Sequence, residues 1–187
     1  MAACTDSSAP CSDLPDAASA LALGGGNSSF MALSDGDAVT LVPGNQGGQH
    51  VWIQVHSQSL CPTHPRVRVR IVRSSDGVQI GFSQFAGNTW TEVSGMPGTY
   101  TSTPFAATIE PDRYCTVLHG GRVRVEVVVD DTIGHVAERS VNLVIQGWTP
   151  EALAADRAAR DTCCANVSSP LCWPDGPPDA GMDVATD

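Results

Sequence analysis

The segment "GGRVRVEVVVDDTIGHVAERSVNLVI", residues 120–145, decides the fold. Within 122–130 the valines at every second position form one face, and arginine and glutamate occupy the other. This period of two is typical of a β-strand with one buried face. "DTIG" (131–134) is a turn sequence, and 135–146 reads as the returning strand. The segment therefore predicts two antiparallel strands. The alternating residues are Val123, Val125, Val127 and Val129, with Arg122, Arg124 and Glu126 between them.

Further strand-like segments precede this pair at regular intervals. "SSDG" (74–77) adds a hairpin turn with Asp-Gly at its centre. No long helical period interrupts the strands, which argues against a parallel α/β fold. We therefore expect an all-β chain that forms an antiparallel β-sandwich of about seven to nine short strands. The other predicted strands are 38–42, 49–57, 66–73, 78–85, 89–93 and 99–109.

The 120–145 segment resembles the last two strands of bacterial immunoglobulin-like repeats. That resemblance implies an immunoglobulin-like antiparallel β-sandwich. The inter-sheet cysteines and buried tryptophan of antibody domains are not evident at their usual spacing, so only the broad sandwich class is implied.

Composition divides the chain into four parts. Residues 1–16 are a polar N-terminal tether, 17–147 form the β-sandwich domain, and 148–173 form a short helix with a cysteine-rich cap. The helix is predicted because Thr149 can cap it and Pro150 suits its first turn. Residues 174–187 are rich in Pro, Gly and Asp, which predicts a disordered acidic tail.

The N-terminal "MAACTDSSAPCSD" (1–13) resembles the last part of a bacterial lipobox and the tether behind it, although the pattern has Leu where Met1 stands. The resemblance implies that Cys4 is acylated. "GPPDAG" (176–181) resembles low-complexity segments of myxobacterial and related surface lipoproteins. Both imply an exported, lipid-anchored protein of the cell envelope, in the outer membrane or periplasm. Because no run of 18 apolar residues exists, we expect membrane contact through the lipid alone.

Seven cysteines occur, and acylation of Cys4 would leave six for disulfides. No C-x₂₋₄-C pair of a zinc site exists, which favours an oxidised, exported protein. Six cysteines allow 15 pairings. Their positions favour a Cys61–Cys115 bond inside the β region and two bonds near the chain ends. In that scheme one of Cys163 and Cys164 reaches Cys11, and the other reaches Cys172.

The net charge is −10, and all ten basic residues are arginines. A chain this acidic is repelled by nucleic acid and by anionic membranes, so we expect no nucleic-acid partner. Most of the arginines are spaced by two along predicted strands, and we take this spacing as evidence against a recognition cluster.

In "HVWIQVH" (50–56), His50 and His56 lie on one strand face roughly 20 Å apart, too far to share a metal. The favoured interpretation is an amphipathic strand whose Val51, Ile53 and Val55, or else Trp52, face the core. A copper or zinc site would need histidines from other elements, with methionine as a soft copper ligand. The candidates are His50, His56, His64, His119 and His135, with Met31 and Met96.

Two pairs of carboxylates, Asp35 with Asp37 and Asp130 with Asp131, could bind calcium, although turns also favour Asp. Motifs of catalysis are missing: "GFSQF" places Ser83 in a predicted strand without the second glycine of a nucleophile elbow, and "ALGGGNSS" precedes no helix. We expect neither an enzyme nor a cofactor. The predicted function is a binding or structural module whose partner is an envelope protein or polysaccharide. The alternative is a periplasmic metal-binding protein that uses His50, His56, His119 and His135.

Overall fold

The computed structural model describes residues 11, 19–43, 49–86, 89–110, 117 and 121–146, and within these ranges every regular element is a strand. The strands are β1 (Ala20–Gly25), β2 (Met31–Ala32), β3 (Ala38–Val39), β4 (Val42–Pro43), β5 (Gln49–Gln58), β6 (Arg66–Arg73), β7 (Gln79–Phe85), β8 (Thr91–Glu92), β9 (Thr99–Thr101), β10 (Phe105–Ile109), β11 (Arg122–Asp130) and β12 (Val136–Ile145).

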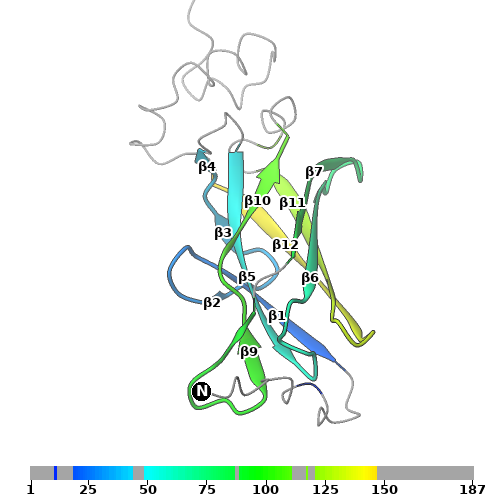
Figure 1. The fold of residues 1–187 in the computed structure, drawn as a ribbon. Coiled ribbons are helices and arrows are strands. Elements are labelled where there is room, and N and C mark those ends of the chain that lie inside the picture. Colours follow the sequence, from blue (N-terminus) through cyan, green and yellow to red (C-terminus); the bar gives the residue numbers. More distant parts are fainter. Residues whose placement is uncertain are drawn as a thin grey trace, which may run out of the picture.

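The strands form two curled sheets that pack face to face (Figure 1). One sheet has the order β2-β1-β5-β9-β8, with β4 and β10 also paired to β5. The other has the order β3-β12-β11-β6-β7, in which β3 alone runs parallel to its neighbour. Two mainly antiparallel sheets in this arrangement make an immunoglobulin-like β-sandwich. The prediction of an all-β sandwich is confirmed.

The strand pair of residues 120–145 is confirmed as β11 and β12, which pair along their whole length from Arg122↔Val144 to Asp130↔Val136. The turn between them depends on Gly134, whose φ of 98° lies in the region that favours glycine. β11 also pairs with β6, so that it lies at the centre of its sheet.

The core lies between the two sheets and takes one face from each long strand. Fully burying a valine or isoleucine side chain stabilises the fold by about 1.5–3 kcal/mol. The inward residues of β5, β6 and β11, three of the four longest strands, are Val51, Ile53, Val55, Val67, Val69, Ile71, Val123, Val125, Val127 and Val129. The valines of β11 and the aliphatic residues of "HVWIQVH" therefore face the core, as predicted.

The glycine-rich stretch near residue 24 holds the end of a strand, and the chain leaves the strand only at Gly26, whose φ is 96°. β1 runs through Gly24 and Gly25 and pairs with β5. A Cβ at Gly24 would lie 2.6 Å from the ring of Phe30, so glycine leaves room for that ring to cover the strand. Here glycine permits a close approach rather than a turn.

The two sheets come together where β7 meets β10. Glu110 N donates to Ile80 O at 2.8 Å, and Thr108 N donates to the Ser83 hydroxyl at 3.0 Å. A Cβ at Gly81 would lie 2.2 Å from Thr108 O, so only glycine permits this approach. The side chain of Ser83 is thereby engaged in holding two strands together.

The predicted 99–109 strand is divided into β9 and β10. Between them, Ser102 N donates to Val55 O and the Ser102 hydroxyl accepts from Val55 N, both at 2.9 Å. Pro104 follows and has no N–H to continue the ladder. The chain therefore changes its pairing position along β5 at this point.

Several predictions fall outside the described residues. These are the 148–173 helix and cap, the 174–187 tail, and all of the 1–16 tether except Cys11. In the portion that the structure describes, no helix has the length and hydropathy needed to cross a membrane.

Candidate functional site

The outer face of the five-stranded sheet carries arginines on β6 and β11. Their valine and isoleucine neighbours are buried, so alternation turns the arginines outward, where they are exposed. The two strands are antiparallel, with Glu126 opposite Arg70 and Arg124 opposite Val72. Arg122 lies one step further, where its carbonyl accepts from Ser74 N at 2.9 Å.

We call two outward residues that face one another across β6 and β11 a row. The register gives five successive rows, and each row contains one arginine. The rows are about 6.6 Å apart, so the arginines span roughly 26 Å. We call this set the arginine stripe: Arg66, Arg68 and Arg70 on β6, then Arg124 and Arg122 on β11. The pairing of β6 with β11 thus continues the row of arginines from one strand onto the next, which the spacing along a single strand does not show.

Three arginines of the stripe are held by carboxylates on β11. Arg68 Nη2 lies 2.8 Å from Asp130 Oδ2, Arg70 Nε 2.6 Å from Glu126 Oε2, and Arg124 Nε 2.7 Å from Glu126 Oε1. Their side chains remain 44–49% exposed. Exposed pairs of this kind contribute at most about 1 kcal/mol, so their main effect is to orient the guanidinium groups.

The two ends of the stripe differ from its middle. Arg66 and Arg122 are exposed, and neither forms an ion pair within the described part of the chain. Each therefore presents a full positive charge to solvent. The stripe has oriented arginines in its middle and unpaired ones at its ends.

Neutral groups flank the stripe on both sides, together with one acidic residue, Glu138 on β12. On β7, Phe82 lies opposite Arg70 and Gln84 opposite Arg68, and Phe82 is 49% exposed. On β12, exposed Ser140 lies opposite Glu126. A shallow hollow of about 580 Å³ over β11 and β12 is lined by Arg124, Glu126, Glu138 and Ser140 together with their neighbours.

The histidine-bearing face of β5 is covered rather than open. The His56 ring stacks on Phe30 with centroids 3.5 Å apart, and His50 meets the edge of Trp52 at 4.8 Å. Burial lowers the pKa of both His50 and His56, because the charged imidazolium loses water. His50 Nε2 and Gln54 Oε1 have no hydrogen-bond partner among the described residues. This face is therefore packed and mainly uncharged.

The other metal candidates are dispersed. His64 lies in the connection before β6, His135 lies in the β11–β12 turn, Met31 and Met96 are exposed, and His119 is outside the described residues. Among the described residues no three His, Cys, Asp or Glu side chains are placed to hold a metal ion. Two of the proposed calcium ligands have other partners: Asp35 accepts from Asn142 N at 2.7 Å, and Asp37 accepts from Ser34 N at 2.8 Å.

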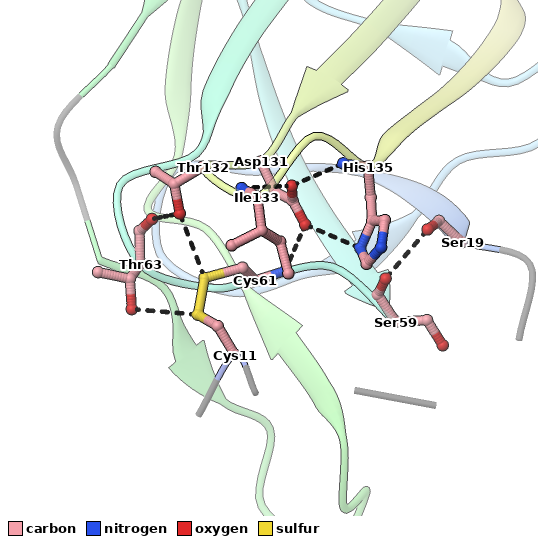
Figure 2. Close-up of polar contacts among 9 residues, drawn as sticks. All are labelled: Cys11, Ser19, Ser59, Cys61, Thr63, Asp131, Thr132, Ile133 and His135. Carbon is pink, nitrogen blue, oxygen red and sulfur yellow. Dashed lines mark hydrogen bonds and ion pairs between the residues drawn. A yellow bond between two sulfur atoms is a disulfide. The ribbon is translucent and has the colours of Figure 1, made fainter. Parts of the chain in front are cut away.

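Asp131 joins the β11–β12 turn to the connection between β5 and β6 (Figure 2). Its carboxylate accepts from the backbone N–H groups of Cys61 at 3.0 Å, Ile133 at 3.0 Å and His135 at 2.8 Å. His135 Nδ1 lies 3.2 Å from the same carboxylate. Burial opposes ionisation, but the three N–H donors outweigh it, so the pKa of Asp131 is lowered. The group organises a turn and is not free to ligate calcium.

Cys61 bonds to Cys11, so the predicted Cys61–Cys115 pairing is wrong (Figure 2). β1 pairs antiparallel with β5, with Ala20 opposite Gln58, which places the start of β1 beside the end of β5. Ser19 Oγ adds a hydrogen bond to Ser59 O at 3.0 Å. The bond ties the N-terminal segment to the sandwich. Cys4, Cys115, Cys163, Cys164 and Cys172 lie outside the described residues.

No protein-family model matches the chain, and no curated protein matches it in sequence. Solved structures that resemble it include CopC from Methylosinus trichosporium OB3b, at 15% identity over 61% of this chain and 86% of that one, with a TM-score of 0.31. The CooA pilin subunit from enterotoxigenic Escherichia coli is 10% identical over 68% and 99%, with a TM-score of 0.34. Murine CRIg is 14% identical over 68% and 98%, with a TM-score of 0.27. All three have immunoglobulin-like or β-sandwich folds, and the likeness extends to the fold class alone.

Proposed function

We propose that the protein is a non-enzymatic binding module of the bacterial cell envelope, anchored by a lipid on Cys4, which binds an anionic partner through the arginine stripe. The observation that carries this proposal is the gathering of five arginines on one exposed sheet face of a chain with a net charge of −10. A surface of one sign on a molecule of the opposite sign directs where a charged partner binds.

The local charge balance supports the proposal. The outer face of β6, β11 and β12 has five arginines and three carboxylates, Glu126, Asp130 and Glu138, a local excess of two positive charges. The whole chain has 20 acidic and 10 basic residues. An anion therefore meets attraction at this face and, averaged over the chain, repulsion elsewhere.

We expect the protein to be retained on a sulfonated cation-exchange matrix at pH 7 and low salt, in spite of its pI of about 4.7. The double variant R66Q/R122Q should bind about fivefold more weakly, because it removes the two unpaired cations and leaves no carboxylate without its arginine. Elution salt concentration and equilibrium binding to the resin measure the effect.

The matched control is S28D/S94D, which makes the same change in net charge at exposed turn positions of the other sheet. It should be retained nearly as well as the parent protein. If both variants bind the resin equally weakly, retention depends on net charge alone, and the arginine stripe is not the binding surface.

The lipid anchor has a separate test. We expect the native protein to begin at Cys4, with acyl chains on that residue, and to be extracted with the membrane fraction. Mass spectrometry of the native N-terminal peptide measures this. A soluble form with unmodified Cys4 would contradict the anchor while leaving the binding face untouched.

A further inference from the structure

We infer that the ligand of the arginine stripe is a linear acidic polysaccharide, a chain of hydroxyl-bearing sugars with carboxylates at regular intervals, which lies along β6 and continues onto β11. This inference rests on the proposed function and goes further, because it names the chemistry of the partner.

The shape of the stripe favours a linear polymer over a small anion. The five arginines are arranged in single file, one to a row, over roughly 26 Å. They do not converge on a point, as they would around a single phosphate or carboxylate. A chain with repeated charges can engage several rows at once, which raises its overall affinity above that of one contact.

The arginine geometry suits carboxylates. A guanidinium has five N–H donors in a planar fork and binds a carboxylate through two of them. Among the described residues no carboxylate engages the guanidinium groups of Arg66 and Arg122, and Arg68, Arg70 and Arg124 are already oriented by Asp130 and Glu126. Carboxylates from outside would therefore bind first at the two ends of the stripe.

The neutral neighbours indicate a sugar. Gln84 and Ser140 flank the stripe with exposed amide and hydroxyl groups that can exchange hydrogen bonds with sugar hydroxyls. Phe82 is 49% exposed beside Arg70, and its flat ring can cover the apolar face of a pyranose. The hollow beside Arg124 leaves room for a substituent of the chain.

Other polyanions match this face less well. Single-stranded nucleic acid is held by successive aromatic side chains on which its bases stack, whereas this face has one exposed aromatic ring within the described residues. An acidic polypeptide has the charges but no ring for Phe82 to cover and few hydroxyls for Gln84 and Ser140. The combination of cations, neutral donors and one ring is met by a carboxylated sugar chain.

The test compares the intact protein on four probes: polygalacturonate, polyglutamate of similar length, single-stranded DNA and neutral dextran. We expect polygalacturonate to bind about tenfold more tightly than polyglutamate, and dextran not to bind. R66Q/R122Q should weaken polygalacturonate binding about fivefold, and S28D/S94D should leave it nearly unchanged. Titration calorimetry at low and moderate salt gives the affinities.

A second variant separates sugar recognition from charge attraction. F82A should weaken polygalacturonate binding about fivefold and leave retention on the sulfonated matrix unchanged, because it alters no charge. Circular dichroism and urea unfolding check that F82A remains folded.

The outcomes separate the two proposals. Equal affinity for polygalacturonate and polyglutamate, or an F82A variant with unchanged affinity, would overturn the polysaccharide inference while the anion-binding face stands. Tighter binding of DNA than of polygalacturonate would assign the face to nucleic acid. Absence of binding to every charged polymer and to the sulfonated matrix would overturn both proposals.

Discussion

Replacing Asp131 by Ala is expected to lower the free energy of unfolding by about 3–5 kcal/mol. The Asp131 carboxylate accepts three backbone N–H groups, from Cys61, Ile133 and His135, and its side chain is fully buried. Alanine would leave these donors without the carboxylate, and the buried N–H of Cys61 alone costs about 1–3 kcal/mol when it is left without a partner. The part-buried N–H groups of Ile133 and His135 cost less each, because water can reach them. Urea unfolding followed by tryptophan fluorescence gives the difference.

The neighbouring Asp130 provides the control. Its carboxylate pairs with exposed Arg68 on the outer face, so D130A should cost no more than about 1 kcal/mol. If both variants lose the same free energy of unfolding, the three backbone hydrogen bonds of Asp131 contribute no more to stability than an exposed ion pair does.

The pKa of Asp131 adds a pH dependence to the same experiment. A carboxyl whose folded-state pKa lies below its unfolded value stabilises the protein above the unfolded value, and this stabilisation is lost as pH falls through the folded value. The protein should therefore lose stability below about pH 4, the usual pKa of Asp. D131N should lose less stability over this acid range, because its amide does not titrate.

Removing the Cys11–Cys61 disulfide is expected to lower the free energy of unfolding by about 4 kcal/mol. The bond closes a loop with a sequence separation of 50 residues, and the chain-entropy relation gives this value for a loop of that size. The variant is C11A/C61A, in which neither partner of this bond remains as an unpaired thiol. Urea unfolding of the variant and the parent protein measures the loss.

A reductant supplies the control for this variant. With the bond reduced in the parent protein, the difference between the two proteins should fall to about 1 kcal/mol, the remaining effect of the smaller side chains. Non-reducing peptide mapping identifies the bond directly. A peptide linking Cys61 to Cys115 would contradict the pairing.

The parts of the fold that depend on local pattern could be predicted from the sequence. Alternation within 122–130 and the turn at 131–134 suffice to give β11 and β12, because each strand buries one face and the turn sets their register. β1 was missed because Gly24 and Gly25 suggest a break, and their use as room for Phe30 depends on a ring folded back over the strand.

The disulfide and the arginine stripe depend on contacts between distant segments. The Cys11–Cys61 bond follows from the pairing of β1 with β5, and β1 itself was not predicted. The stripe requires the register of β6 against β11, which are separated in the chain by β7 to β10. Spacing along one strand shows which face a side chain occupies, but only the pairing shows which side chains are neighbours.

The Cys11–Cys61 bond has a mechanical consequence. Tension applied at the N-terminal end of the chain passes through the sulfur atoms to Cys61 and does not pull on β1, whose residues lie inside the covalently closed loop. That loop shields roughly 170 Å of extensible chain from the load. A force applied through an anchored N-terminus therefore acts on the sandwich in the connection between β5 and β6, where the Asp131 carboxylate accepts from the Cys61 backbone N–H. Reduction of the bond would transfer the load to β1, whose hydrogen bonds to the sheet could then break one after another.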